Sequence, residues 1–326
     1  MVKFIKKHLI SELKDGDSID DVFVVKIKKG VSQYANGYYF HILLSDSSGK
    51  NIDYKFWGSK DEEAVRKLYD SIKADSVVHI KGKFSFYKGI PQITTSEPDI
   101  IEVLEKGLYD ESDFVKKPKK DIENMYKDLM KIVDSVKDEQ LKKLLLSIFG
   151  DDLIKEKFKV HPGGIEIHHN WIGGLLQHTL ETTKYCELSS ELCPTINRDL
   201  LISGALLHDI GKLEEIEVTA RIKGTRKGQL HGHFVLGSIL VKNKMDELKI
   251  DEEIKDRLFH IIISHHGSND LGSPKEPMTP EAFAVYYADE MSSKLAEIIE
   301  YIEDNKNGTE DEFKYHYKKE RNIFLR

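Results

Sequence analysis

Seven side chains in the second half of the chain are of the types that bind transition metals, and they occur in the order H, HD, H, HH, D. They are His178, His208, Asp209, His233, His265, His266 and Asp289. Imidazole nitrogens with carboxylate oxygens suit divalent ions such as Mn, Fe, Ni or Zn. Because one catalytic ion needs fewer ligands, the set predicts two ions. Ten of the fourteen histidines lie between His161 and His266, which favours one site over an even surface scatter.

The helices that must hold these ligands can be predicted from hydrophobic periodicity. Candidate helices cover residues 122–136, 139–149, 172–192, 198–209, 233–248, 252–265 and 280–304. In the last of these, Asp289 shares a face with Tyr286, and a carboxylate on a largely apolar face calls for a cation. His208 and Asp209 end an apolar helix with Gly211 as the expected cap, so both side chains are held at a rigid terminus.

The first hundred residues alternate apolar and polar side chains, as strands do. Strands are predicted over 20–29, 37–45 and 51–57, a helix over 60–74, and two further strands within 77–95. This βββαββ order predicts a five-stranded OB β-barrel in residues 1–105. A charged segment that contains Pro118, residues 106–121, is the expected linker. Residues 122–326 are expected to form an all-α domain, so the predicted fold class is α+β and multidomain.

Five segments carry a resemblance to a known family: GGLLQHTLE, LLHDIGK, GHFVLGS, ISHHGS and YYADEMSSK. In this order they resemble the HD-domain metal-dependent phosphohydrolases, and the tandem His265-His266 is typical of the types that bind two metals. Joined to an N-terminal OB domain, they are similar to the YhaM family of bacterial 3′→5′ exoribonucleases over nearly the whole chain. The resemblance implies an HD domain in residues 122–326 and hydrolysis of single-stranded RNA, with single-stranded DNA as a further substrate, to nucleoside monophosphates.

The resemblance also implies how the ligands divide between two ions. The first ion would be held by His178, His208, Asp209 and Asp289, and the second by Asp209, His233, His265 and His266. Two ions about 3.5 to 4 Å apart share a carboxylate, here Asp209, and can hold a hydroxide between them as the nucleophile. Lys212, directly after the HDIG turn, is the candidate that offsets charge on the phosphoryl oxygens. Manganese is favoured by analogy, with Fe, Ni, Zn and Mg as alternatives.

Substrate contacts are expected beside the metal ligands. Of His161, His168 and His169, the last is preferred as a phosphate contact on resemblance, with an ordinary polar loop as the alternative. A basic stretch without acidic residues joins two metal-ligand segments and contains Arg221, Lys223, Arg226 and Lys227. We expect this stretch to form a short hairpin or a flexible loop. We expect it to grip the backbone phosphates of the substrate, against the alternative of a solvated basic loop.

The OB domain supplies a second set of expected contacts. Its strands carry many aromatic rings, most of which must form the core, and the rings left on the surface can stack bases. Alternation places Lys81 and Lys83 on one face of their strand, so these two lysines are the expected contacts.

Composition and charge are those of an ordinary soluble protein. Of the 326 residues, 40% are apolar and 32% are charged, and the net charge is −7. Residues 1–105 carry 16 Lys and Arg and 16 Asp and Glu, so the acidic excess falls on the remainder. That excess permits a phosphate substrate where metals supply local positive charge. Without a long apolar run or signal-peptide pattern, we expect no membrane partner and a cytoplasmic location. A homo-oligomer is compatible with the sequence.

Two other functions are compatible with these residues. The first is an HD phosphohydrolase that acts on a small nucleotide, with the OB domain serving assembly. The second is a regulatory factor that binds single-stranded nucleic acid and whose metal site is incidental. The complete ligand set argues against the second, since a binding protein has no need of seven ligands. The direction of cleavage and the product come from the resemblance alone.

Overall fold

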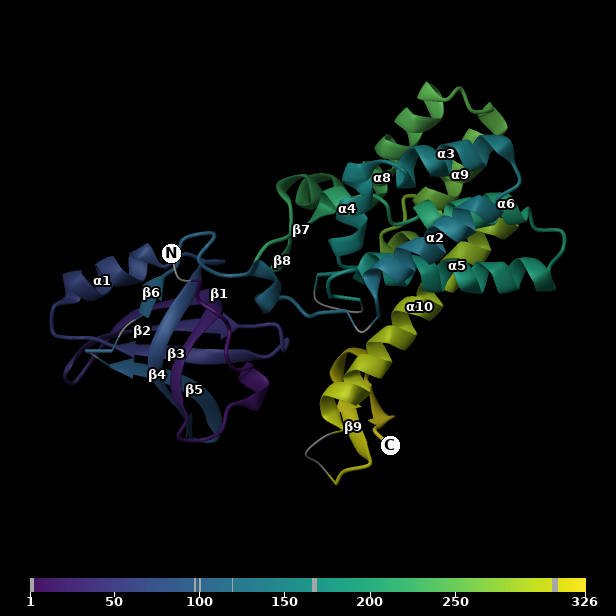
Figure 1. Cartoon of the computed structure of the whole chain (residues 1–326). Helices are drawn as coiled ribbons and strands as arrows, with labels where there is room; N and C mark the ends of the chain where they lie inside the picture. The colour runs from purple at the N-terminus through teal and green to yellow at the C-terminus, as the bar shows by residue number, and fades with distance from the viewer. Residues whose placement is uncertain (1–2, 97, 100, 119, 166–168, 307–309) are drawn as a thin grey trace. The chain divides into compact units, whose positions relative to one another are not determined.

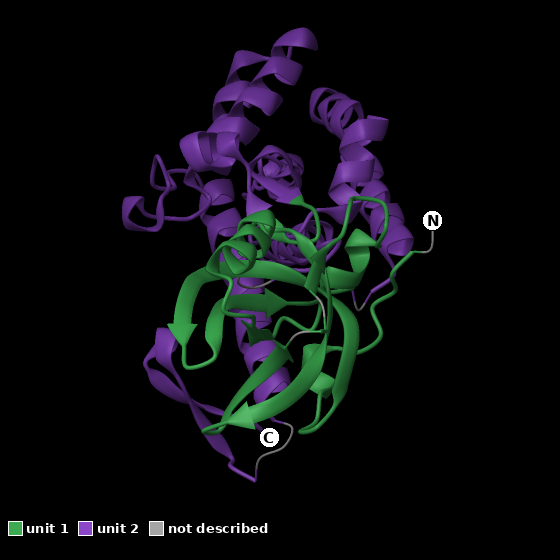
Figure 2. Cartoon of the chain, turned by 90° about the vertical axis from the view of Figure 1, so that its left-hand side faces the viewer, with its two compact units in different colours: residues 1–117, 218–222 green, residues 118–217, 223–326 purple. Residues whose placement is uncertain are grey.

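The computed structural model describes residues 3–96, 98–99, 101–118, 120–165, 169–306 and 310–326 (Figure 1). The chain divides into two compact units, which Figure 2 colours separately: residues 1–117 with 218–222, and residues 118–217 with 223–326. Residues 106–117, expected in the linker, therefore lie in the first unit. Phe114 is buried there, within an apolar cluster that also includes Ala220.

The first unit is built on a closed five-stranded barrel. Its strands are β1 (Ser18–Tyr34), β2 (Gly37–Ser45), β3 (Asn51–Trp57), β4 (Val77–Tyr87) and β5 (Ile90–Ser96). The order β1-β2-β3-β5-β4 closes by pairing of β4 with β1, and β3 runs parallel to β5 while the other neighbours are antiparallel. Helix α1 (Glu62–Ser71) joins β3 to β4, and β6 (Ile101–Val103) adds to β4. This is an OB barrel. With the helical second unit, it confirms the predicted fold class.

The barrel closes because β1 bends. Its residues up to Val24 pair with β4, and those from Val24 onward pair with β2. Register shifts after Val25 and after Lys28 mark bulges that bend the strand. In β2 and β3 alternate side chains are buried in the barrel: Phe40, Ile42, Leu44, Ile52, Tyr54 and Phe56. The remaining positions form an outer face of polar and aromatic residues.

The second unit is helical around one apolar core. Its seven longest helices are α2 (Ile122–Ser135), α3 (Glu139–Phe149), α5 (Gly174–Leu192), α6 (Arg198–Leu207), α8 (Arg226–Glu247), α9 (Glu252–Ser264) and α10 (Pro280–Asn305). They match the predicted helices within a few residues, apart from the earlier start of α8. Asp121 and Asp138 accept hydrogen bonds from first-turn N–H groups, so capping fixes where α2 and α3 begin.

The second half of the chain also contains several short elements, and the strands among them correct the expectation that residues 122–326 are entirely helical. Two are helices, α4 (Asp152–Val160) and α7 (Lys212–Glu215), and four are strands: β7 (Ile216–Val218), β8 (Ile222–Gly224), β9 (Phe313–His316) and β10 (Arg321–Phe324). The β7–β8 hairpin is one of the two forms expected for the basic stretch, whereas β9 and β10, with four residues each, are too short for alternation to be recognised. Short 3-10 turns lie at Ile10–Glu12, Glu111–Phe114, Asn269–Leu271 and Tyr317–Lys319.

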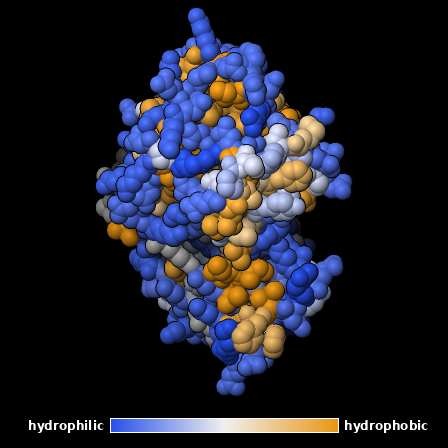
Figure 3. Space-filling view, turned by 90° about the vertical axis from the view of Figure 1, so that its right-hand side faces the viewer, coloured by the Kyte–Doolittle hydropathy of each residue, from blue (hydrophilic) through white to orange (hydrophobic). Residues whose placement is uncertain are grey.

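Helix α10 leaves an apolar stripe exposed. Its members stand four residues apart and are between 46% and 62% exposed: Phe283, Tyr287, Met291, Leu295 and Ile299. Residues at this spacing lie on one face of a helix. Figure 3 shows apolar side chains gathered on one face of the molecule. None of the helices in the described part of the chain combines the length and apolar character needed to cross a bilayer.

Candidate metal centre

The seven predicted ligands converge within the second unit. Five elements supply them: α5 carries His178, α8 carries His233, α10 carries Asp289, and the two pairs His208-Asp209 and His265-His266 directly follow α6 and α9. Two groups each place three ligand atoms within 4.8 Å of one another: His178, His208 and Asp209, and His233, His265 and His266. Segments far apart in the sequence thus deliver side chains of metal-binding type to one place.

The first group surrounds one oxygen of Asp209. The Nε2 atoms of His178 and His208 lie 3.2 Å apart, and each lies 3.4 Å from Asp209 Oδ2. Asp289 joins this group, since its Oδ1 is 3.0 Å from His178 Nε2. Atoms bound to one transition metal at about 2.0 to 2.2 Å have mutual separations of this order. The spacing of His178, His208 and Asp209 therefore fits ligands of one ion, and Asp289 lies beside them at His178.

The second group surrounds the other oxygen of Asp209. Its Oδ1 lies 3.6 Å from His265 Nε2 and 3.7 Å from His233 Nε2. Among the described residues, these three buried atoms have no hydrogen-bond partner. Leaving a buried polar atom unsatisfied costs about 1 to 3 kcal/mol. A divalent cation placed between the two nitrogens and the oxygen would satisfy all three, so the residues present fit a metal ion.

Hydrogen bonds at Nδ1 orient the histidine rings. His208 Nδ1 lies 2.7 Å from the Ala205 carbonyl oxygen, and His265 Nδ1 lies 2.6 Å from that of Ile262. Both carbonyls belong to the last turn of a helix, where they lack a helical partner. His266 Nδ1 lies 3.2 Å from the Leu271 carbonyl oxygen. A ring that donates from Nδ1 keeps its Nε2 lone pair for a metal.

Glu215 orients His233 in the same way, and the sequence analysis missed it. Helix α8 is kinked at Gly232, whose φ of 71° and ψ of 161° are non-helical. The backbone N–H of His233, which opens the second half of the helix, donates to Glu215 Oε1 at 3.1 Å. The Nδ1 of the same histidine lies 3.1 Å from Glu215 Oε2. The signal for this role in the sequence was the position of Glu215, a carboxylate one helical turn after the HDIGK segment.

His169 lies behind His178, which corrects its expected role as a substrate contact. Its side chain is buried, and its Nε2 lies 3.0 Å from Glu181 Oε2. Ser292 Oγ lies 3.0 Å from His178 Nδ1 and donates to Glu181 Oε2 at 3.2 Å. Glu181 therefore supports His178 through Ser292. Because the His169 ring is fully buried against Glu181, it cannot contact a substrate phosphate. His161 is also buried, and His168 lies outside the described residues.

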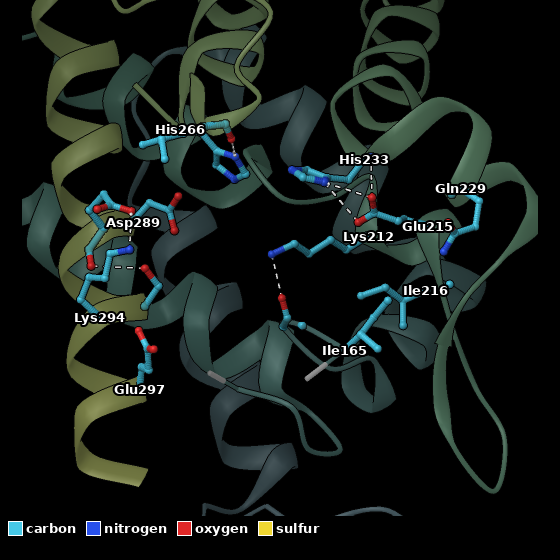
Figure 4. A pocket seen from close by; sticks show the side chains of 17 residues that line it. Ile165, Lys212, Glu215, Ile216, Gln229, His233, His266, Asp289, Lys294 and Glu297 are labelled. Carbon is cyan, nitrogen blue, oxygen red and sulfur yellow. Dashed lines mark hydrogen bonds and ion pairs between the residues drawn. The ribbon is translucent and has the colours of Figure 1, made fainter. Parts of the chain in front are cut away.

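Lys212 points into the centre of the site (Figure 4). Its Nζ lies 2.6 Å from Asp209 Oδ2 and donates to the Gly163 carbonyl at 2.7 Å. The preceding Gly211 has a φ of −64°, so it is not the left-handed glycine cap common at helix ends. A Cβ at Gly211 would lie 2.0 Å from the His233 carbonyl oxygen. Glycine is needed there because α8 passes so close, and this approach brings His233 to Asp209.

A cavity of about 780 Å³ opens beside Lys212. Its wall includes His233, His266 and Asp289 of the ligand set, together with Glu215, Gln229 and residues of α10 (Figure 4). Ile165 and Ile216 supply an apolar part of the same wall. Small-molecule sites occupy roughly 300 to 1,000 Å³. The cavity therefore has the volume of a small-molecule site, with Lys212 and the two isoleucines on its wall.

Burial and charge act in opposite directions on the pKa values in this site. Burial would raise the pKa of Asp209, but the charges of Lys212 and His208 hold it well below its usual value. Burial alone would lower the pKa of His178, but the carboxylates of Asp209 and Asp289 outweigh burial and raise this pKa to about 9. At His265 burial prevails and lowers the pKa to about 3. The carboxylates are thus ionised and attract cations, and the His265 ring is neutral.

The basic stretch between the ligand segments is largely engaged by neighbouring carboxylates. Arg221 belongs to the first unit and pairs there with Asp75 at 2.7 Å. Ion pairs also engage two lysines: Lys223 with Glu217 at 3.4 Å, and Lys227 with Glu214 at 3.1 Å. Arg226 is exposed on the first turn of α8. Arg221 is therefore engaged by a carboxylate within the first unit, whereas Arg226 is exposed.

The outer face of the barrel carries an aromatic cluster. Tyr39 on β2 lies opposite Trp57 on β3, and their rings are stacked with centroids 4.8 Å apart. Tyr34 meets Trp57 edge-on at 4.9 Å. Farther along, Phe86 and Tyr87 at the end of β4 are 53% and 55% exposed. These are the surface rings of the barrel that could stack with bases.

The two lysines predicted as contacts have different surroundings. Lys83 on β4 is paired in register with Thr94 on β5, which in turn lies beside Lys55 on β3. Lys81 instead lies opposite Asp20 on β1. Both lysines are exposed. Lys83 therefore extends a basic row across the sheet, while Lys81 has an acidic residue as its cross-strand neighbour.

Comparison with known proteins bears on both units. Residues 175–294 match the family model described as the HD domain, and all seven predicted ligands fall within that segment. This match indicates a metal-dependent phosphohydrolase. The HD domain thus lies in the helical unit, C-terminal to the OB barrel.

Three solved structures are similar to part of this chain. The second OB-fold domain of replication protein A from Methanococcus maripaludis is 18% identical, with 31% of this chain and 96% of that chain covered and a TM-score of 0.25. A replication protein A heterotrimer bound to ssDNA is 20% identical, with 37% and 29% covered and a TM-score of 0.25. The p204 HINb domain is 12% identical, with 30% and 47% covered and a TM-score of 0.24. This chain thus spans about half of the p204 chain.

Proposed function

We propose that the protein is a two-metal phosphodiesterase that shortens single-stranded RNA, and also single-stranded DNA, from the 3′ end and releases nucleoside monophosphates. One observation carries the two-metal part of this proposal. Asp209 turns its Oδ2 toward His178 and His208, 3.4 Å away, and its Oδ1 toward His233 and His265 at 3.7 and 3.6 Å. A carboxylate placed between two groups of ligands in this manner suits a bridge between two ions.

The proposed ligand sets are those that the resemblance implies, and the position of Asp209 between the two groups supports them. His178, His208, Asp209 and Asp289 would hold the first ion, and Asp209, His233, His265 and His266 would hold the second. When bound, the ions would supply an activated water as nucleophile and polarise the scissile phosphate. Mn²⁺ is the proposed ion, with Fe, Ni, Zn and Mg as alternatives, because imidazole with carboxylate accepts several divalent metals.

The protein's own groups would position the phosphate and balance its charge. The Lys212 ammonium is held by Asp209 and the Gly163 carbonyl at the cavity wall. Burial opposes its charge, but Asp209 raises the pKa of Lys212, so the side chain stays protonated. A phosphoryl oxygen bound beside it would meet a fixed positive charge as negative charge develops during attack. Arg226, exposed on α8, is the proposed contact for the next phosphate along the strand.

A single-stranded polymer is the proposed substrate because of the outer face of the barrel. Stacked Tyr39 and Trp57, with Lys55 and Lys83 across the same sheet, combine base-stacking rings and phosphate-binding cations. The 3′→5′ direction and the monophosphate product rest on the resemblance to the YhaM family.

The proposal is tested by incubating the protein with 5′-labelled single-stranded RNA and DNA, with Mn²⁺ or with chelator. A ladder of shortening 5′-labelled products that needs the metal is expected. The variant Asp209→Asn tests the metal centre, because asparagine keeps the shape of the side chain and removes its charge. This variant should fold and bind RNA but lose hydrolysis. Metal-dependent hydrolysis that persists in Asp209→Asn would refute the site.

A small nucleotide is the second candidate substrate. The cavity of about 780 Å³ is large enough to enclose one without help from the barrel. Turnover of a cyclic dinucleotide and nucleoside phosphate panel should then exceed turnover of an oligonucleotide. Faster hydrolysis of the oligonucleotide would exclude this alternative.

A homo-oligomer is proposed on the exposed stripe of α10. Apolar patches of this kind often mark protein contacts. Sedimentation velocity of the wild type and of Met291→Glu tests it. A shift to the monomer is expected in the variant, and an unchanged sedimentation coefficient would count against this interface.

A further inference from the structure

The C-terminal hairpin presents aromatic rings to solvent. In the pairing of β9 with β10, Phe313 lies opposite Phe324 and Tyr315 lies opposite Asn322, so the three rings share one face. Phe313, Tyr315 and Phe324 are 57%, 45% and 48% exposed, and Tyr317 in the connecting turn is 85% exposed. We call these four residues the aromatic face. The Phe313 and Phe324 rings lie 5.2 Å apart, as do those of Tyr315 and Tyr317.

The opposite side of the hairpin is fastened to α10. His316 is buried, and its ring lies 4.4 Å from that of Tyr301. The Tyr301 hydroxyl donates to the Tyr315 carbonyl at 2.9 Å. Lys319 Nζ lies 2.6 Å from Glu297 Oε2. The aromatic face is therefore held by a helix and is ordered before any ligand arrives, which lowers the entropic cost of binding.

Glu297 connects the hairpin with the cavity. This residue lines the cavity wall (Figure 4), and it is also the partner of Lys319. Hairpin, α10 and cavity all belong to the second unit. The hairpin is therefore attached to the cavity wall through Glu297.

The charge of the hairpin suits a polyanion. Residues 313–326 contain five Lys and Arg but one Glu, in a chain whose net charge is −7. Lys318 and Arg321 are exposed on it. The acidic residues 310–312 precede the first strand, so the positive charge is confined to the strands and their turn. Flat rings interleaved with cations are the means by which proteins bind single strands without reading their sequence.

We propose that the aromatic face is a stacking platform for the bases of single-stranded nucleic acid whose end lies in the cavity. This inference rests on the proposed function and adds a binding site to it. The platform would bind any base, because every base offers a flat face to an aromatic ring. Long substrates would gain affinity from it, whereas a substrate confined to the cavity would not.

The test measures RNA affinity in an Asp209→Asn background, where no turnover disturbs binding. Tyr315→Leu with Phe324→Leu removes two rings and keeps apolar volume. Loss of each stacked ring should weaken binding of a labelled single strand about fivefold or more, by fluorescence anisotropy. Tyr315→Phe with Phe324→Tyr keeps the rings and should retain wild-type affinity.

The possible results separate this inference from the proposed function. With Asp209 restored, the leucine pair should hydrolyse a small phosphodiester at the wild-type rate but degrade long RNA more slowly. Equal degradation of long RNA would overturn the platform while leaving the exonuclease proposal intact. The stacking platform would also be overturned if the leucine pair showed unchanged RNA affinity but a changed sedimentation coefficient. That result would assign the aromatic face to contact with a second copy of the chain. If the leucine pair does not fold by circular dichroism, Tyr317→Leu in the turn serves as the test.

Discussion

The Lys212 ammonium lies 2.6 Å from Asp209 Oδ2, the oxygen that also faces His178 and His208. A buried cation thus shares one carboxylate oxygen with the candidate ligands of a metal ion. The two positive charges compete for that oxygen, yet both favour a phosphate nearby. Metal affinity and turnover should therefore respond differently when Lys212 is changed.

Lys212→Met tests this competition. Methionine keeps the length of the side chain but not its charge, so the variant should bind Mn²⁺ more tightly than the wild type. Hydrolysis at saturating metal should fall by about 100-fold, the usual loss for one group that stabilises transition-state charge. Calorimetric titration and single-turnover assays measure the two effects. Wild-type turnover with unchanged metal affinity would assign Lys212 a purely structural role.

Glu215→Gln tests the support of His233. The amide offers only one acceptor oxygen to the His233 N–H groups, and it lacks the charge that favours the ring as a ligand. Metal affinity should fall by about 10- to 100-fold, as for other partners of metal-bound histidines. Glu214→Gln is the matched control, because its carboxylate pairs with Lys157 and Lys227 instead. Equal losses in both variants would show that the effect is general charge removal.

Lys83→Glu and Lys81→Glu should differ in their effect on RNA binding. Lys83 lies in a row with Lys55, so a reversed charge there should weaken binding. Each lost phosphate contact should also reduce the slope of log affinity against log salt by about 0.7 for a single strand. Lys81 lies outside this row and beside Asp20 in the strand register, so Lys81→Glu should have the smaller effect. The opposite ranking would place the bound strand on another face of the barrel.

Tyr126 should make stability fall at high pH. Its buried hydroxyl donates to the Phe149 carbonyl, and burial raises the pKa of Tyr126 to about 12. An unfolded tyrosine titrates near pH 10, so the folded state holds the proton more tightly. The resulting stability is complete below about pH 10 and is lost as the pH rises through about 12.

Tyr126→Phe measures this contribution. The variant should lose about 1 kcal/mol of unfolding free energy near neutral pH, because it lacks one buried hydrogen bond. Its further loss at about pH 11 should be smaller than that of the wild type. Urea titrations at both pH values give the comparison. An identical alkaline decline in both proteins would contradict the role of this hydroxyl.

Periodicity predicted the long elements because their patterns span many residues. The barrel strands and the helices that carry His178 and Asp289 are of this kind. Glu215 could not be predicted, since its contact with His233 depends on a kink at Gly232 and on the close passage of α8 past Gly211. Such contacts arise from packing, and spacing along the chain does not record them.

Residue type alone also misplaced some polar side chains. His169 and Arg221 are of the types that bind phosphate, but His169 pairs with Glu181, 12 residues further along the chain, and Arg221 pairs with the distant Asp75. The aromatic face escaped notice because its strands have four residues each. In each case the missing information was which distant segment lies beside the residue.

The placement of residues 218–222 in the first unit has a consequence for cleavage of the chain. The segments on either side of it belong to the second unit, so the polypeptide passes between the units three times. Ala220 and Arg221 are held in the first unit by apolar packing and by an ion pair with Asp75. A protease that cuts only near Pro118 would therefore leave two fragments that copurify as one noncovalent complex. A second cut within the β7–β8 hairpin would be needed to release the barrel as an independent piece.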